Sequence, residues 1–375
     1  MAVPTCALWY TVAYPPTDIG VEWALMGYTV GANGFMKTID VCVVGFRDSE
    51  DDIPRWVALK KGEKGKDGRV SKVRLPLPTT LRGRIIYALD YLLASRGGSF
   101  FLNRAFSWAM EPICSYDPPP GYRPFLKSRI RSILIQTLAT DILFNVIATQ
   151  PWNFTSPYPL TNGLPIGWQI FYTLAIGLQI YFSLFLMTDV LTVVVVPLFR
   201  LHPETWMPFW WEPYKSSSLE EFWSTRWHAT FQRVFYRMSI PAVEALRPYV
   251  KKPVLRFSRA FFIFIFSAIY HMAIPLVRSP WDHENRYLVF WEWSVIMCFL
   301  SQPFGLLLES MVVRPATEGL SGSWKTGMRR AYFWVWLVWT GRWFCDSYLL
   351  YGPFGDIPFG PFSPTLVLLR LFNRK

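Results

Sequence analysis

Apolar segments of helix length recur along this chain of 375 residues and constrain its fold more than any other feature. The longest, Ile166–Phe199, is too long for one upright membrane helix, which needs about 20 residues, and too short for two spans with a turn. We expect one long tilted helix there, or a helix followed by an interfacial piece. Further candidate spans are Val21–Phe46, Ile130–Thr149, Phe257–Leu276, Tyr287–Val313 and Ala331–Tyr351. The sequence therefore predicts an all-α, polytopic transmembrane helical bundle.

Composition supports a membrane protein. Charged residues make up 17% of the chain, against about 25% in soluble domains. The net charge of +12 comes from cations that gather between apolar runs, where they would face an anionic cytoplasmic leaflet. We therefore expect the lipid bilayer as a partner, and no nucleic acid. The five cysteines lie far apart without a CxxC pair, so neither a disulfide framework nor a metal site is expected.

The segments between the spans show no domain boundary. Arg55–Arg84 reads as a basic loop and Gln150–Pro165 as a Pro-rich loop, while apolar residues at helical spacing in Arg82–Arg96 predict a half-buried or re-entrant helix. We expect residues 1–375 to form a single domain.

A basic loop, Arg200–Arg256, is predicted to be cytoplasmic by the positive-inside rule. Ser217 and Ser218 precede Glu220 and Glu221 at capping-box spacing, which predicts a helix from Leu219 through Arg237. On that helix Trp223, Trp227 and Phe231 would share one side and the arginines another. Such a helix suits a membrane surface without catalytic duty, or the mouth of a tunnel, and periodicity leaves both open.

His271 lies inside the apolar run before Pro275. An ionisable side chain within a membrane span is costly, so a functional role is the first hypothesis. The alternative is a core histidine that is hydrogen-bonded to a neighbouring helix.

Three stretches resemble a known family. Ser218–His228, with the sequence SLEEFWSTRWH, resembles the S-L-x-x-F-W-x-x-R-W-H signature of the wax-synthase-like branch of the membrane-bound O-acyltransferases. Phe264–His271 is similar to that family's F-x-x-S-G-x-x-H element, except that Ala268 replaces the usual glycine. Tyr87–Gly97 is similar to its W-A-L-D-x-L-x-x-x-R-G stretch. The resemblance places a wax-synthase-like core at about residues 82–313.

The resemblance implies a membrane-bound O-acyltransferase fold in the endoplasmic reticulum. It implies transfer of an acyl group, with acetyl favoured, from acyl-CoA as co-substrate to the hydroxyl of a lipophilic alcohol, such as a terpenoid or another secondary metabolite. A long-chain wax ester synthase is the alternative, and no cofactor or metal is expected. The implied catalytic residues are His271 and His228, and the implied substrate-binding residues are Phe222, Trp223, Arg226 and Trp227.

The chemistry of acyl transfer fits these histidines. The alcohol must lose its proton as its oxygen attacks the thioester, and histidine, whose ordinary pKa is about 6.5, suits a base at neutral pH. Desolvation favours the neutral ring, so His271 should be ready to accept a proton. His228 would polarise the thioester carbonyl as a donor, or else it is an interfacial anchor. No G-x-S-x-G nucleophile motif is present, which favours direct transfer.

Other polar residues fall within the predicted spans. Arg342 and Asp346 are four residues apart, which predicts an ion pair. Asp141 and Asp189 would line a polar tunnel or face other helices, and the sequence does not decide between the two. A membrane transporter would also place polar residues in spans, but it would usually show repeated halves, and none are visible.

Overall fold

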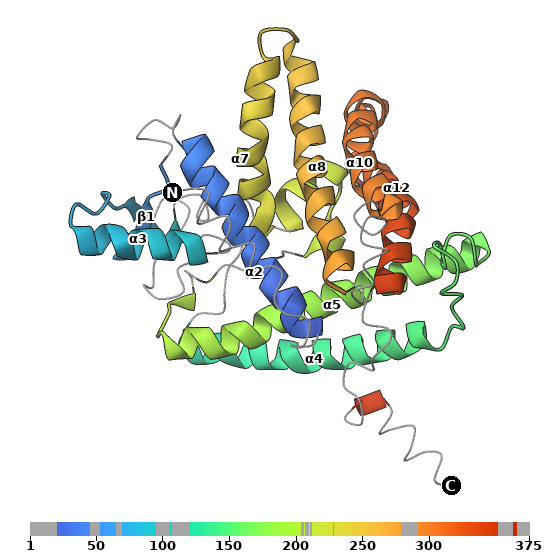
Figure 1. Cartoon of the computed structure of the whole chain (residues 1–375), viewed down its shortest axis with the longest axis horizontal. Coiled ribbons are helices and arrows are strands. Elements are labelled where there is room, and N and C mark those ends of the chain that lie inside the picture. The colour runs from blue at the N-terminus through green and yellow to red at the C-terminus, as the bar shows by residue number, and fades with distance from the viewer. Residues whose placement is uncertain are drawn as a thin grey trace.

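The computed structural model describes residues 21–45, 53–64, 70–94, 105–106, 121–203, 206, 210, 212–227, 229–278, 292–351 and 363–365. Helices dominate this part of the chain, which confirms the predicted all-α polytopic bundle (Figure 1). The longer helices are α2 (Val21–Ile39), α3 (Leu81–Leu93), α4 (Tyr122–Ala148), α5 (Ile166–Leu198), α7 (Ala229–Leu246), α8 (Lys252–Arg278), α10 (Trp293–Leu308) and α12 (Gly322–Tyr351). Shorter pieces are α6 (Leu219–Glu221), α11 (Arg314–Glu318), the 3₁₀ turn η6 (Pro213–Lys215) and the π-helical turns η2 (Asp40–Val44), η7 (Phe222–Arg226) and η8 (Glu309–Val313).

Four helical segments within the described residues are long and apolar enough to cross a membrane. They are α4, α5, Lys252–Met272 of α8, and the continuous stretch Trp293–Glu318 that joins α10, η8 and α11. The segment Ile166–Leu198 is one helix, so the long apolar run forms a single element. A proline at position 197 and the left-handed backbone of Arg200 (φ 50°) mark its end.

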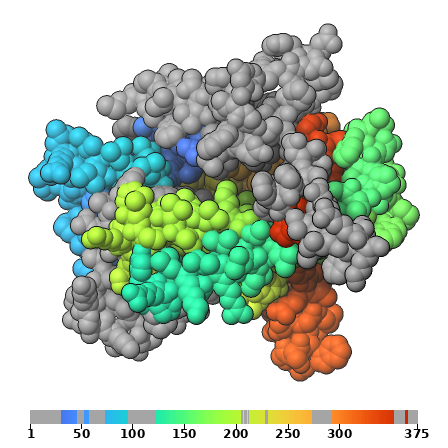
Figure 2. Space-filling model, turned by 90° about the horizontal axis from the view of Figure 1, so that it is seen from below, coloured from blue at the N-terminus to red at the C-terminus, as the bar shows by residue number. Residues whose placement is uncertain are grey.

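Helices α4 and α5 lie side by side across one face of the molecule, below the upright helices α7, α8, α10 and α12 (Figures 1 and 2). Buried carboxylates tie these two helices to their neighbours. Asp189 of α5 accepts hydrogen bonds from Arg129 and Gln136 of α4, both at 3.0 Å. Asp141 of α4 accepts from Ser363 at 2.6 Å and from the backbone N–H of residue 365 at 2.7 Å. Both aspartates thus face other parts of the protein.

The upright helices place α10 between α8 and α12, and both neighbours pack against it. Gly305 permits a close approach to α10. A Cβ there would lie 2.4 Å from the Trp336 indole of α12 and 2.9 Å from the Leu219 side chain of α6. A larger residue there would require the Trp336 and Leu219 side chains to move. The start of α6 is therefore held close to α10.

The prediction of one helix from Leu219 through Arg237 is wrong. The helix begins at Leu219, but it widens into the π-helical turn η7, which ends at Arg226, and the backbone of Trp227 is extended (φ −105°, ψ 135°). A separate helix, α7, begins at Ala229. As a result Phe231 packs with Met36 and Tyr270 in another hydrophobic cluster, away from Trp223.

The basic segment Arg55–Arg84 is not simply a loop. It contains strands β1 (Trp56–Lys64) and β2 (Val70–Arg74), which pair antiparallel, and β1 also pairs with β3 (Ala105–Phe106). The helix predicted at Arg82–Arg96 is present as α3, capped by the Thr80 side chain. The Pro-rich stretch between α4 and α5 has neither helix nor strand, as expected.

The predicted ion pair between Arg342 and Asp346 is also wrong. Asp346 instead accepts hydrogen bonds from the N–H groups of Leu160 and Thr161 and from the Thr161 hydroxyl. Arg342 donates to Gln169 at 2.6 Å and lies over the Trp339 ring at 3.6 Å. Each of the two residues thus binds a partner outside α12.

Candidate active site

His271 lies near the C-terminal end of α8, and only 8% of its surface is exposed. Its Nδ1 lies 2.7 Å from the backbone carbonyl oxygen of Ser267, one turn earlier. A carbonyl oxygen can only accept, so Nδ1 must carry the proton in this hydrogen bond. The neutral ring then has its lone pair on Nε2, because the two nitrogens of neutral imidazole share one proton.

Aromatic rings from two other helices surround His271. The Phe299 ring of α10 stacks on the imidazole with centroids 4.3 Å apart, and the Phe344 ring of α12 meets it edge-on at 5.8 Å. Aromatic neighbours exclude water and thereby favour the neutral imidazole. Three helices thus fix the position and the environment of this ring.

Trp223, in the signature segment, reaches the same cluster. Its ring meets Phe264 of α8 edge-on at 5.3 Å and lies 6.4 Å from Phe299. Its indole N–H donates to the side chain of Gln302 on α10 at 3.2 Å. Phe299 therefore touches both His271 and Trp223, and the structure brings the two sequence elements together on α10.

The signature segment is held in shape by its own first turn. The Ser218 hydroxyl accepts from the N–H of Glu221 at 3.0 Å, so Ser218 is the N-cap that the sequence predicted. The Glu221 carboxylate accepts in return from the N–H of Ser217 at 2.8 Å. The N–H of Trp227 closes the π-helical turn on the carbonyl of Phe222 at 2.8 Å. π-Helical turns are rare and occur often at functional sites.

Phe222 and Trp227 stack on each other at 5.4 Å on the side of this turn that faces α12. Phe222 also packs against the Phe333 ring of α12 at 5.3 Å, and Trp227 lies 6.4 Å from Trp210. These two residues thus belong to an aromatic cluster adjacent to that of Trp223.

Arg226 forms an ion pair with Glu221 at 2.6 Å and donates to the backbone carbonyl of Glu212 at 3.3 Å. Partial burial would raise the pKa of Glu221, but the hydrogen bonds from Ser217 and the nearby Arg226 guanidinium outweigh it, and the pKa lies below its ordinary value. Glu221 thus couples the helix cap to the arginine of the signature.

His228 lies outside the described residues, so its role stays a prediction.

Three described residues that the sequence did not single out belong to the site: Phe299, Phe344 and Gln302. Phe299 and Phe344 look like ordinary apolar residues of a span. Gln302 is a polar residue within an apolar run, and that was its one available signal.

Comparison with known protein families gives a match that covers part of this site. Residues 206–293 match the model of the membrane bound O-acyl transferase family, and this segment contains both the signature and His271. The four apolar helices and the match together identify an integral membrane protein, and the match supports membrane O-acyltransferase activity. Neither the curated proteins nor the solved structures gave a match to this chain.

Proposed function

We propose that this protein transfers an acyl group from acyl-CoA to the hydroxyl of a lipophilic alcohol, with His271 as general base. The observation that carries the proposal is the hydrogen bond from Nδ1 of His271 to the Ser267 carbonyl, which leaves the lone pair of a neutral imidazole on Nε2. A neutral histidine is the protonation state that a base requires.

The reaction needs no acyl-enzyme. The alcohol gives its proton to Nε2 of His271 while its oxygen bonds to the thioester carbon. The resulting tetrahedral intermediate expels the sulfur of CoA, the C–S bond breaks, and the imidazolium returns the proton to the thiolate. An ester and free CoA leave, and the histidine is neutral again. His228 donates a hydrogen bond to the carbonyl oxygen, where negative charge develops.

The resemblance gives four residues of the signature segment substrate-binding roles, and their surroundings are compatible with these roles. The partly exposed Trp223 and Trp227 would offer aromatic surface to an apolar substrate, and the buried Phe222 would support their rings from behind. Arg226 would meet a CoA phosphate by exchanging part of its pairing with Glu221, since both side chains are partly exposed. Residues 1–375 act as one domain in this proposal, in the endoplasmic reticulum membrane.

The acceptor class and acyl length rest on the resemblance of Ser218–His228 to the wax-synthase-like branch. It favours acetyl transfer to a terpenoid or another secondary-metabolite alcohol. Long-chain wax ester formation is the alternative within the same chemistry.

Release of free CoA by microsomes that contain the protein tests the proposal. Acetyl-, octanoyl- and palmitoyl-CoA are each supplied with a terpenoid alcohol or a long-chain alcohol, and the ester is identified by mass spectrometry. Alcohol-dependent release with acetyl-CoA and the terpenoid alcohol is expected. Preference for palmitoyl-CoA and the long-chain alcohol would replace acetylation by wax synthesis. No alcohol-dependent release with any pair would overturn the proposed function.

A further inference from the structure

One side of α10 and its extension connects the parts of the candidate site. Phe299 stacks on His271, Gln302 accepts from Trp223, and Gly305 lies against Leu219. Glu309, at the start of η8, continues this side of the helix, since it follows Gln302 by two turns. It is 1% exposed.

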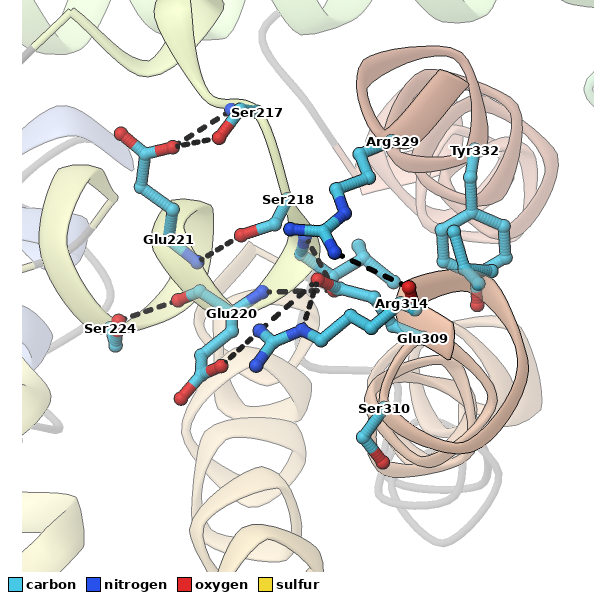
Figure 3. Close-up of polar contacts among 12 residues, drawn as sticks. Ser217, Ser218, Glu220, Glu221, Ser224, Glu309, Ser310, Arg314, Arg329 and Tyr332 are labelled. Atoms are coloured by element: carbon cyan, nitrogen blue, oxygen red, sulfur yellow. Dashed lines mark hydrogen bonds and ion pairs between the residues drawn. The ribbon is translucent and has the colours of Figure 1, made fainter. Parts of the chain in front are cut away.

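The Glu309 carboxylate points at the beginning of the signature segment (Figure 3). Its Oε2 accepts from the N–H of Leu219 at 2.9 Å and from the N–H of Glu220 at 3.3 Å. Its Oε1 accepts from Arg314, which also pairs with Glu220.

These contacts satisfy backbone groups that the helix itself cannot satisfy. The first N–H groups of a helix have no partner within it, and a negative charge is favourable there. Ser218 caps the N–H of Glu221, so Glu309 supplies the acceptors for the two preceding groups. A carboxylate from a distant helix thus completes the cap of α6.

We infer that Glu309 is a positioning residue that fixes the signature segment against α10, and so keeps Trp223 beside the rings around His271. The inference rests on the proposed function for its kinetic consequence. Its structural part, the cap in trans, stands on the contacts themselves. A small displacement of reacting groups is costly in an enzyme, and a misplacement of about 1 Å can cost about 10²-fold in rate.

Two substitutions of Glu309 distinguish the loss of the helix cap from the loss of the negative charge. In Glu309→Gln the amide oxygen can replace Oε2 at both N–H groups, although the pair with Arg314 is lost. In Glu309→Leu the volume remains but both N–H groups lose their acceptor. At saturating acyl-CoA and alcohol, we expect Gln to keep at least about a third of turnover and Leu to lose about tenfold or more, since misplacement carries the cost. Glu318→Leu, an exposed glutamate on the adjoining α11, is the control and should retain full turnover.

Hydrogen exchange read by mass spectrometry supplies a measure that does not require turnover. The amides of residues 219–220 should exchange slowly in the unmodified protein and in Glu309→Gln, and faster in Glu309→Leu, while amides of α4 and α5 stay unchanged in all variants. If the protein transfers no acyl group, the proposed function fails and this exchange pattern still decides the capping.

Three results would overturn the inference: Leu within threefold of the unmodified enzyme, Gln as inactive as Leu, or slow exchange at residues 219–220 in the Leu variant. Apparent melting temperatures in detergent accompany each assay. A Gln variant that rescues turnover while Leu does not, at equal protein level, is expected from positioning and would not follow from a loss of charge.

Discussion

Replacing Asp346 with Ala should loosen the Pro-rich segment from α12. The carboxylate accepts from the N–H of Leu160 at 2.7 Å, the N–H of Thr161 at 3.1 Å and the hydroxyl of Thr161 at 2.6 Å, and it is fully buried. Hydrogen bonds to charged groups contribute about 1.5–3 kcal/mol each, and a buried donor left without a partner costs about 1–3 kcal/mol. Water can reach Thr161, which is partly exposed, but not the buried Leu160.

We therefore expect Asp346→Ala to destabilise the protein by about 3–6 kcal/mol, because two of the three bonds are partly replaced by water. At about 2–4 °C per kcal/mol, the apparent melting temperature in detergent should fall by at least about 6 °C. Asp346→Asn keeps an acceptor oxygen for both N–H groups, and the Thr161 hydroxyl can turn to accept from the new amide. Asp346→Asn should therefore lower the apparent melting temperature by less than half as much as Asp346→Ala does.

The assay is thermal unfolding in detergent, and a size-exclusion profile after heating measures how much protein remains folded. Turnover should fall as well in Asp346→Ala, because Phe344, two residues earlier on α12, lies 5.8 Å from His271. Equal melting temperatures for Ala and the unmodified protein would refute the reasoning, as would an Asn variant no better than Ala.

Three other predictions concern charge, topology and the second histidine. Because the pKa of Glu221 in the folded protein lies below its ordinary value of 4.5, ionised Glu221 stabilises the fold above that pH. This stabilisation should be lost as the pH falls through the lower pKa of the folded state. Melting temperatures of Glu221→Gln between about pH 3 and 6 should lack this pH dependence. Since α5 is a single helix long and apolar enough to cross the membrane once, Asn153 in the Pro-rich stretch before it and Lys215 in η6 after it should lie on opposite sides. Engineered cysteines at the two positions can be labelled from outside sealed microsomes. Finding both on one side would disprove a single crossing. At position 228, His228→Asn should keep part of the acyl transfer and His228→Leu should lose most of it, and equal activities would remove this residue from the site.

The sequence could predict the membrane bundle because long apolar runs have few other solutions. It could also predict the N-cap at Ser218, since capping depends on residues three positions apart. The match of residues 206–293 to the family model supports the class of protein that the signature suggested.

Long-range partners account for what the sequence could not predict. Periodicity predicted that Trp227 is helical, but the helix ends with the π-helical turn before it, and the backbone of Trp227 is extended. Arg342 and Asp346 looked like a pair by spacing, yet Gln169 and Leu160, which bind them, lie more than 150 residues earlier. Glu309 caps a helix that begins 90 positions before it. No local pattern contains that information.

The central claim, that His271 is the base of acyl transfer, is tested most directly by His271→Ala. Turnover of acyl-CoA and alcohol should fall by about 10²- to 10⁴-fold, the usual cost of losing a general base, with membrane insertion and protein level unchanged. His202→Ala, at a histidine in the segment after α5, is the matched control and should keep full activity. Near-normal turnover in His271→Ala at matched protein level would contradict the account.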